Sequence, residues 1–318
     1  MSKIGYICLI KSQTDMRVRN ILFSIAVTAV LAAAGAADAG AQQKRALVIG
    51  IGDYPAGSGW REINGDRDVE LIVPMLRSIG FAQENIFTLV NEEATKSAIE
   101  AAFRDLASAA EERDELYIHF SGHGQQVTDL SGDEPDGLDE ALIPYDAAIE
   151  YGRNGYKGQN HILDDELGVW LEALRESVGP KGVIVVALDA CHSGDATRGE
   201  EDEQEHVRGT SEIFGMPGAA RSDGGHIAAP ADGRKARKAD VDWVCMSACK
   251  SYQSNYEYKS ESGYYGRLSW AVSKVLKPGL VFEDFIGGVE ELYDLMPLPG
   301  PPQDLDVDVP ASYNGMLF

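Results

Sequence analysis

Two short segments of the chain each place a reactive side chain directly after an apolar run. "VVALDACHSG" carries Cys191, and "YIHFSGHG" carries His123. An apolar run that ends in small residues and glycine is typical of a buried strand followed by a loop. A thiol beside an imidazole can perform acyl transfer, because the imidazole takes the thiol proton and the thiolate attacks a carbonyl carbon. The two motifs therefore suggest a cysteine nucleophile with a histidine base.

Each motif alone has a plainer interpretation. A cysteine at a strand end is usually inert packing, and a histidine in a glycine-rich loop is usually a surface residue. A metal pair formed by His119 and His123 is disfavoured, because that spacing on an extended segment is too long for one ion. The chain also lacks Cys-x-x-Cys and His-Glu-x-x-His patterns. The occurrence of both motifs at equivalent strand ends favours the catalytic interpretation.

The rest of the chain supplies elements that would position these two side chains. Apolar runs predict strands, and apolar residues at intervals of three and four predict helices. The expected strands are 45–54, 85–90, 115–120, 182–190 and 241–249, and the expected helices are 66–81, the segment capped by Thr95, 165–177, 268–276 and 282–296. Such alternation is typical of a parallel sheet covered by helices on both faces. The carboxyl ends of parallel strands meet at one edge, so His123 and Cys191 would lie together there.

Composition and charge limit the partners that the protein would bind. The 318 residues are 44% hydrophobic, an ordinary proportion for a globular protein. The excess of 51 acidic over 28 basic residues gives a net charge of −23. This charge repels phosphate backbones, so no nucleic acid is expected as a partner. Peptides with basic side chains are more suitable partners for an acidic protein. For the oligomeric state, we expect a monomer.

The N-terminal region has the pattern of an export signal. Arg17 and Arg19 precede an apolar stretch over 21–34, and small residues follow up to Ala39 and Ala41. A basic region, a short apolar core and small residues at the cleavage site define a secretory signal peptide. The core is too short for a comfortable membrane span. We therefore expect an exported protein, periplasmic or secreted, without stable membrane insertion after signal removal.

Cysteine usage in the expected mature protein also points to a reactive thiol. Cys8 lies upstream of the mature part, which leaves Cys191, Cys245 and Cys249. An odd number of cysteines in an exported protein leaves at least one thiol outside any intramolecular disulfide.

The His and Cys motifs together resemble those of the metacaspases, a family of caspase-like cysteine peptidases. The resemblance extends to "SGDEPDGLDEALIPYD" between the motifs and to "VCMSACKSYQSNYEY" and "YYGRLSWAVSKVL" after them, and it covers nearly all of the chain from Arg45 onward. True caspases carry Gln-Ala-Cys around the nucleophile, whereas this chain has Asp189-Ala190-Cys191, the metacaspase form. The resemblance implies a caspase-like α/β fold, a three-layer α/β/α sandwich with a mostly parallel sheet of about six strands.

The resemblance also implies catalytic roles for the residues at the strand ends. Cys191 is the nucleophile, and His123 is the general base and later the general acid. The backbone N–H groups of Gly124 and Cys191 form the oxyanion hole, which stabilises the charge that develops on the carbonyl oxygen. The implied activity is that of a cysteine endopeptidase.

A pocket for the residue before the cleaved bond, called P1, is implied at Asp68, Ser121 and Asp189. Asp189 lies two residues before Cys191, so strand alternation puts both side chains on the same side. Carboxylates in such a pocket select Arg, and less well Lys, through charge-assisted hydrogen bonds. The expected substrates are therefore proteins or peptides with Arg or Lys at P1.

Acidic residues crowd the segment from Asp129 to Asp165 and suggest a calcium site. Ca²⁺ takes six to eight oxygen ligands in irregular geometry, although most acidic loops are only solvated. By the resemblance, Asp139, Asp164 and Asp165 match three calcium ligands, while a fourth position falls at Arg198, which cannot coordinate. Ca²⁺ is the candidate cofactor, and no organic cofactor is expected.

By this interpretation the chain has an N-terminal extension with signal peptide (1–41), a large catalytic segment (42–195), a flexible loop (196–240) and a small catalytic segment of the same domain (241–318). Protease cleavage concentrates in exposed flexible segments, so the basic residues of 196–240 make self-processing an expectation. Two other functions stay open. One is a catalytically silent caspase-like binding module, and the other is a peptide ligase that uses the same dyad.

Overall fold

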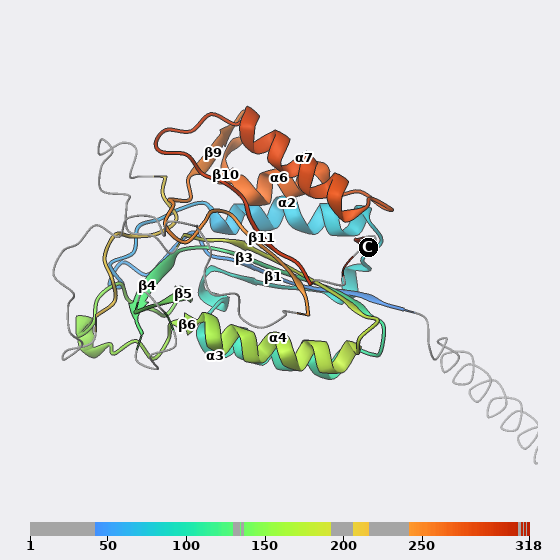
Figure 1. Cartoon of the computed structure of the whole chain (residues 1–318). Coiled ribbons are helices and arrows are strands. Elements are labelled where there is room, and N and C mark those ends of the chain that lie inside the picture. The colour runs from blue at the N-terminus through green and yellow to red at the C-terminus, as the bar shows by residue number, and fades with distance from the viewer. Residues whose placement is uncertain are drawn as a thin grey trace, which may run out of the picture. The chain divides into compact units, whose positions relative to one another are not determined.

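The structure, a computed structural model, describes residues 42–129, 134, 137–191, 206–215, 242–310, 313, 315 and 317–318 (Figure 1). Residues 42–318 form one compact unit. The expected signal peptide lies outside the described residues. In the described part of the chain, no helix is long and apolar enough to cross a membrane.

A six-stranded sheet forms the centre of this unit. Its strands are β1 (Lys44–Gly50), β2 (Ile86–Val90), β3 (Glu115–Ser121), β7 (Val183–Asp189), β8 (Val244–Ser247) and β11 (Asp306–Asp308). The order across the sheet is β11-β8-β7-β3-β1-β2. All neighbouring pairs are parallel except β11 with β8, which is antiparallel.

Helices cover both faces of this sheet (Figure 1). On one face lie α2 (Gly65–Ser78), α6 (Arg267–Val275) and α7 (Phe282–Leu295), and on the other lie α3 (Lys96–Ala109) and α4 (Asp164–Val178). Single 3₁₀ turns occur at Gln83–Asn85, Asn91–Glu93 and Arg153–Gly155. The expected three-layer α/β/α sandwich is confirmed.

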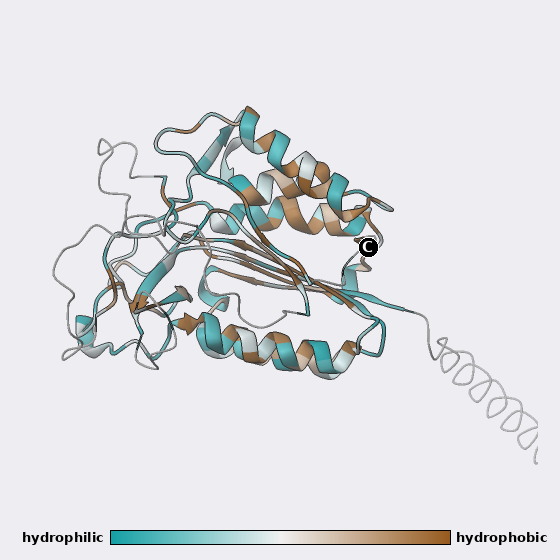
Figure 2. Cartoon of the chain, viewed as in Figure 1, coloured by the Kyte–Doolittle hydropathy of each residue, from teal (hydrophilic) through white to brown (hydrophobic). Residues whose placement is uncertain are grey.

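Two apolar clusters, one on each face of the sheet, explain why these segments form these elements. Figure 2 shows apolar residues along the central strands, which are buried from both sides. On α2, the predicted apolar face packs through Ile72 and Leu76, and on α4 through Leu171 and Leu174. The predicted cap of α3 is also present, because Thr95 Oγ1 accepts a hydrogen bond from the Ala98 N–H at 3.3 Å.

Two small sheets stand beside the central one. An antiparallel sheet consists of β4 (Gly124–Thr128), β5 (Leu138–Leu142) and β6 (Ile162–Leu163), and a hairpin consists of β9 (Glu257–Ser260) and β10 (Gly263–Gly266). The sequence did not predict these strands, because they are short and rich in polar or glycine residues. The first of them begins directly after His123, and the second begins at a residue of the site described below.

Part of the predicted flexible loop differs from that expectation. Residues 206–215 make defined contacts, with Val207 bridged to Tyr256 and Phe214 bridged to Val127. Burial of Arg208 and Phe214 holds the segment in place. A buried arginine with carboxylate partners can hold a segment that has no apolar periodicity. The rest of 196–240 lies outside the described residues.

Candidate active site

The ends of β3 and β7 lie side by side and bring the two motifs together. Ser121 is in register with Asp189, and both are the last residues of their strands. His123 and Cys191 each follow two residues later, so both leave the sheet at the same edge. The sequence predicted this placement from the parallel topology.

His123 is held in one tautomer by a backbone carbonyl. Its Nε2 lies 2.9 Å from the carbonyl oxygen of Arg61, and a carbonyl can only accept, so Nε2 carries the proton. The Nδ1 atom is buried and has no hydrogen-bond partner. The ring stacks on Trp60 with centroids 4.8 Å apart. Burial lowers the pKa of His123 to about 4, so the neutral ring keeps a free lone pair on Nδ1, as a general base requires.

The partner of His123 Nε2 is therefore the Arg61 carbonyl, which the sequence could not identify. A backbone oxygen leaves no signature in residue types. The aromatic pair around His123, formed by Tyr54 and Trp60, also came from outside both motifs. In addition, Tyr54 Oη accepts a hydrogen bond from the His123 N–H at 3.0 Å.

Cys191 is not part of a disulfide and is completely buried in this structure. Its Sγ lies 3.3 Å from the carbonyl oxygen of Gln253, and Cys249 Sγ lies at the same distance from that oxygen. The two thiols therefore share one acceptor. The contact with Cys191, together with burial, raises the pKa of Cys249 well above its usual value. Cys249 is thus a protonated neighbour of Cys191.

The predicted oxyanion donors converge on one atom, the carbonyl oxygen of Arg208. The Cys191 N–H donates to it at 2.9 Å and the Gly124 N–H at 3.2 Å. Two N–H donors that meet at one carbonyl oxygen are the arrangement that an oxyanion hole requires. The segment 206–215 thus places a peptide carbonyl at the two predicted oxyanion donors.

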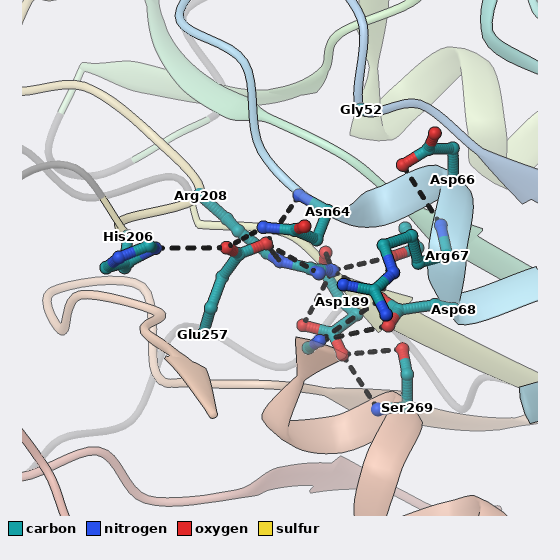
Figure 3. A network of polar contacts seen from close by, with 12 residues as sticks. Gly52, Asn64, Asp66, Arg67, Asp68, Asp189, His206, Arg208, Glu257 and Ser269 are labelled. Carbon is teal, nitrogen blue, oxygen red and sulfur yellow. Dashed lines mark hydrogen bonds and ion pairs between the residues drawn. The ribbon is translucent and has the colours of Figure 1, made fainter. Parts of the chain in front are cut away.

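The guanidinium of the same residue fills the predicted P1 pocket (Figure 3). Arg208 Nη1 donates to Asp68 Oδ2 at 2.7 Å and also to the Ser121 hydroxyl. It lies 3.5 Å from Asp189 Oδ1. The three pocket residues inferred from the resemblance are therefore the ones that surround this guanidinium.

A fourth polar residue of the pocket, Glu257, was missed. Its Oε1 accepts from Arg208 Nη2 at 3.0 Å and from Nε at 3.2 Å. Its two oxygens also accept from the backbone and side-chain N–H groups of Asn64, each at 2.7 Å. Although burial favours the neutral acid, Arg208 and these hydrogen bonds lower the pKa of Glu257 to about 2. The pocket thus binds both edges of the guanidinium, with Asp68 at Nη1 and Glu257 at Nε and Nη2.

The carboxylates of the pocket are oriented by their own neighbours. Asp189 Oδ2 accepts from the N–H and the hydroxyl of Ser269, each at 2.7 Å, and Oδ1 accepts from Asn255 at 2.8 Å. Asp68 Oδ1 accepts from the Gly266 N–H at 3.0 Å. Burial raises the pKa of Asp68 to about 6, against the opposing effect of Arg208. A cation in this pocket therefore also keeps Asp68 ionised.

Gly65 lets α2 approach the sheet closely enough for Asp68 to reach the pocket. A Cβ at this position would lie 2.6 Å from the carbonyl oxygen of Ser121 and 2.4 Å from that of Ile51. Asp68 follows in the first turn of α2. The small residue at the helix start thus sets the depth of the pocket.

The predicted calcium ligands lie at one end of the small antiparallel sheet. Asp139 is in β5, and α4 begins with Asp164 and Asp165. Ala141 pairs with Leu163, so the antiparallel register brings these three carboxylates toward the same end. Within the described ranges, no cluster of three or more His, Cys, Asp or Glu side chains is arranged to hold a metal ion. The donor set therefore fits calcium only in part.

Comparison with known proteins agrees with this geometry. Residues 43–285 match the caspase domain family, Peptidase_C14. Metacaspase-1B of Neosartorya fischeri is 28% identical over 267 residues, which are 74% of this chain and 62% of that protein. Metacaspase-1 of Eremothecium gossypii is 34% identical over 161 residues, 48% of this chain and 32% of that protein. The match thus spans about three fifths of the length of the first of these relatives.

The fold is also found among solved structures. Protein GSU0716 from Geobacter sulfurreducens superposes with a TM-score of 0.56 at 21% identity, over 84% of this chain and 92% of that one. The family match covers most of the chain, and the sheet with its two strand-end motifs agrees with it. The chain is therefore a metacaspase-like member of the caspase domain family.

Proposed function

We propose that this protein is a cysteine endopeptidase that cleaves peptide bonds after Arg or Lys. The observation that carries the proposal is the position of Arg208. Its carbonyl oxygen meets the two oxyanion donors, while its guanidinium fills the acidic pocket. A peptide bound in this way presents its carbonyl carbon to the Cys191 side of the site.

In the proposed mechanism His123 Nδ1 takes the proton of Cys191, and the thiolate attacks the P1 carbonyl carbon. The negative charge that forms on the oxygen is stabilised by the N–H groups of Gly124 and Cys191. Loss of one such donor typically costs about 3 kcal/mol of barrier. His123 then gives its proton to the leaving amine, and water hydrolyses the thioester. The Arg61 carbonyl keeps the ring oriented throughout.

The test is a set of matched fluorogenic peptides that end in Arg, Lys or Asp. The purified protein should hydrolyse the Arg and Lys peptides but not the Asp peptide. Cys191→Ala and His123→Ala should abolish turnover while thermal unfolding stays close to that of the wild type. Cys245→Ala is the matched control and should keep activity, since Cys245 is a thiol of β8 whose polar neighbours are Ser247, Asp306 and Asp308. Substantial turnover by folded Cys191→Ala would refute the mechanism.

Calcium stimulation, export and a monomeric state are also part of the proposal. Asp139, Asp164 and Asp165 would be the protein's ligands, and calcium would reduce their mutual repulsion at the end of the β5–β6 sheet. Export is supported by the N-terminal signal pattern alone. Fractionation of cells that express the full chain tests export, and light scattering tests the monomer.

A further inference from the structure

Residues 206–208 lie against the site as a bound peptide strand. The Arg208 N–H donates to the carbonyl of Asn255 at 3.0 Å, and the Glu257 N–H donates to the carbonyl of His206 at 2.8 Å. Val207 forms an antiparallel bridge with Tyr256 between these two bonds. Backbone pairing of this kind is how extended peptides are commonly held beside a sheet.

The side chains of this strand are also accommodated as those of a ligand would be. The His206 ring stacks on Tyr264 with centroids 3.8 Å apart, and its Nδ1 lies 3.4 Å from Glu257 Oε2. Val207 is buried. Three consecutive residues are therefore specifically bound, and Figure 3 shows the first and the last of them, His206 and Arg208.

The next residue, Gly209, lies directly against the nucleophile. A Cβ at this position would lie 2.9 Å from Cys191 Cβ and 3.2 Å from Cys191 Sγ. Real Cβ atoms rarely approach so closely, so only glycine fits here without displacement of the segment. The Arg208–Gly209 peptide bond thus passes beside Cys191 with its carbonyl in the oxyanion hole.

The segment is held on the far side of the site as well. Gln125 Nε2 donates to the carbonyl of Glu212 at 2.9 Å, and the Phe214 N–H donates to the carbonyl of Gln126 at 2.8 Å. Phe214 packs on His161 with ring centroids 4.4 Å apart. The chain is therefore fixed before and after the Arg208–Gly209 bond.

This arrangement closes the site to other substrates. Cys191, Asp68, Ser121 and Asp189 have no exposed surface, and His123 has 1%. A second peptide could reach the thiol only after residues 206–209 had left. The described state is thus occupied by the chain's own peptide.

We propose that Arg208–Gly209 is the bond at which the protein cuts itself, within one molecule, and that the uncut chain is latent. The inference rests on the proposed peptidase function and specifies its first substrate. Cys191 Sγ bonds to the Arg208 carbonyl carbon, the bond to the Gly209 nitrogen breaks, and that nitrogen takes a proton from His123. A water oxygen then replaces sulfur on the carbon. The products are a carboxylate on Arg208 and an amine on Gly209.

The new carboxylate also explains how the site would open. It forms at the two N–H groups beside Cys191, in a place that is fully buried, and burial disfavours the charged form of a carboxylate. It also loses the covalent link that tied it to the anchored residues 212–214. Both changes favour departure of 206–208 from the pocket, which leaves the pocket free for an external Arg side chain.

The test follows the uncut chain by intact-mass measurement and N-terminal sequencing, together with turnover of a fluorogenic Arg peptide. The wild type should yield a new N-terminus at Gly209, at a rate that does not depend on protein concentration. Peptidase activity should rise in step with this cut. Arg221→Gln, a matched arginine of the same 196–240 region, should behave as the wild type.

Three variants sharpen the result. Cys191→Ala should stay intact after Arg208 even when active wild type is added, because the bond is buried in its own site. Arg208→Gln should lose this cut and show peptidase activity without a lag. If Arg208→Gln fails to fold, Arg208→Lys takes its place as the test variant. It keeps a cation among the buried carboxylates, and it should be cut more slowly at the same bond.

The outcomes separate the two proposals. Three results would overturn the inference and leave the proposed function standing, provided that the protein hydrolyses Arg peptides. They are a cut at another bond, full activity of the uncut chain, and a cut after Arg208 in Cys191→Ala when wild type is added. Absence of Arg peptidase activity in the wild type, with or without a cut, would overturn the proposed function itself.

Discussion

Glu257 should make the enzyme prefer Arg over Lys at P1. Arg208 uses both edges of its guanidinium, with Nη1 on Asp68 and with Nε and Nη2 on Glu257. A lysine carries a single ammonium at the position of the guanidinium carbon, one bond short of Nη1. It can pair with Asp68, but it then leaves Glu257 without a contact to the P1 side chain.

The size of the preference follows from the contacts that lysine forgoes. Hydrogen bonds to charged groups contribute about 1.5–3 kcal/mol. At tenfold per 1.4 kcal/mol, this corresponds to a ratio of kcat/KM for Arg over Lys of roughly 10- to 150-fold. Glu257→Gln removes the charge but keeps the size of the side chain. It should lower kcat/KM for Arg peptides about tenfold, on the same scale, and leave Lys peptides nearly unchanged.

The assay compares two peptides that differ only at P1, hydrolysed by enzyme that has been fully cut beforehand. Asp68→Asn is the comparison variant, and it should weaken both peptides, since either cation reaches that carboxylate. Thermal unfolding of each variant separates a folding defect from a recognition defect. Equal losses for Arg and Lys in Glu257→Gln, or a wild-type ratio near one, would refute the two-edge argument.

Three further results are expected. In the uncut Cys191→Ala protein the melting temperature should fall as pH drops from about 6.5 to 4, because burial lowers the pKa of His119 and His123 to about 4 and of His161 to about 3, and the unfolded chain binds these protons first. Each histidine contributes up to about 3 kcal/mol of this loss of stability. Protonation of Asp68 opposes the loss between pH 6 and 4. If His161→Gln left the slope of melting temperature against pH unchanged, the assignment would be contradicted. Cys249→Ala should keep most of its activity but alter KM, since Cys249 shares the Gln253 carbonyl with Cys191, and loss of turnover would contradict a neighbour's role. After chelation, added Ca²⁺ should raise kcat in the wild type more than in Asp164→Ala, and full activity in excess chelator would remove calcium from the mechanism.

The sequence predicted the residues whose position depends on regular structure. The apolar runs that became β3 and β7 are long enough to predict two neighbouring parallel strands, and Ser121 and Asp189, which were inferred from the resemblance, are in register at their ends. His123 and Cys191 followed from the same topology. These predictions needed only local pattern and the geometry of parallel strands.

The residues that the sequence did not predict are placed in the site by contacts between distant parts of the chain. Glu257 begins a short polar strand and reaches the pocket because Asn64, far away in the sequence, holds its carboxylate. Arg208 belongs to a segment without apolar periodicity and looks like any other basic residue there. Its burial depends on three carboxylates from three different elements, a coincidence that no local pattern encodes. The Arg61 carbonyl is invisible in principle, because every residue has one.

The strand formed by His206, Val207 and Arg208 gives the outline of an inhibitor. A His-Val-Arg tripeptide aldehyde would keep the backbone bonds to Asn255 and Glu257 and the guanidinium in its pocket. Its aldehyde carbon would take the place of the Arg208 carbonyl, and attack by Cys191 would give a hemithioacetal whose oxygen meets the same two N–H donors. Because such a compound enters only after residues 206–209 have left, it would label the open enzyme and pass over the closed one. The sequence of residues 206–208 thus defines an activity-based probe for the enzyme whose active site has opened.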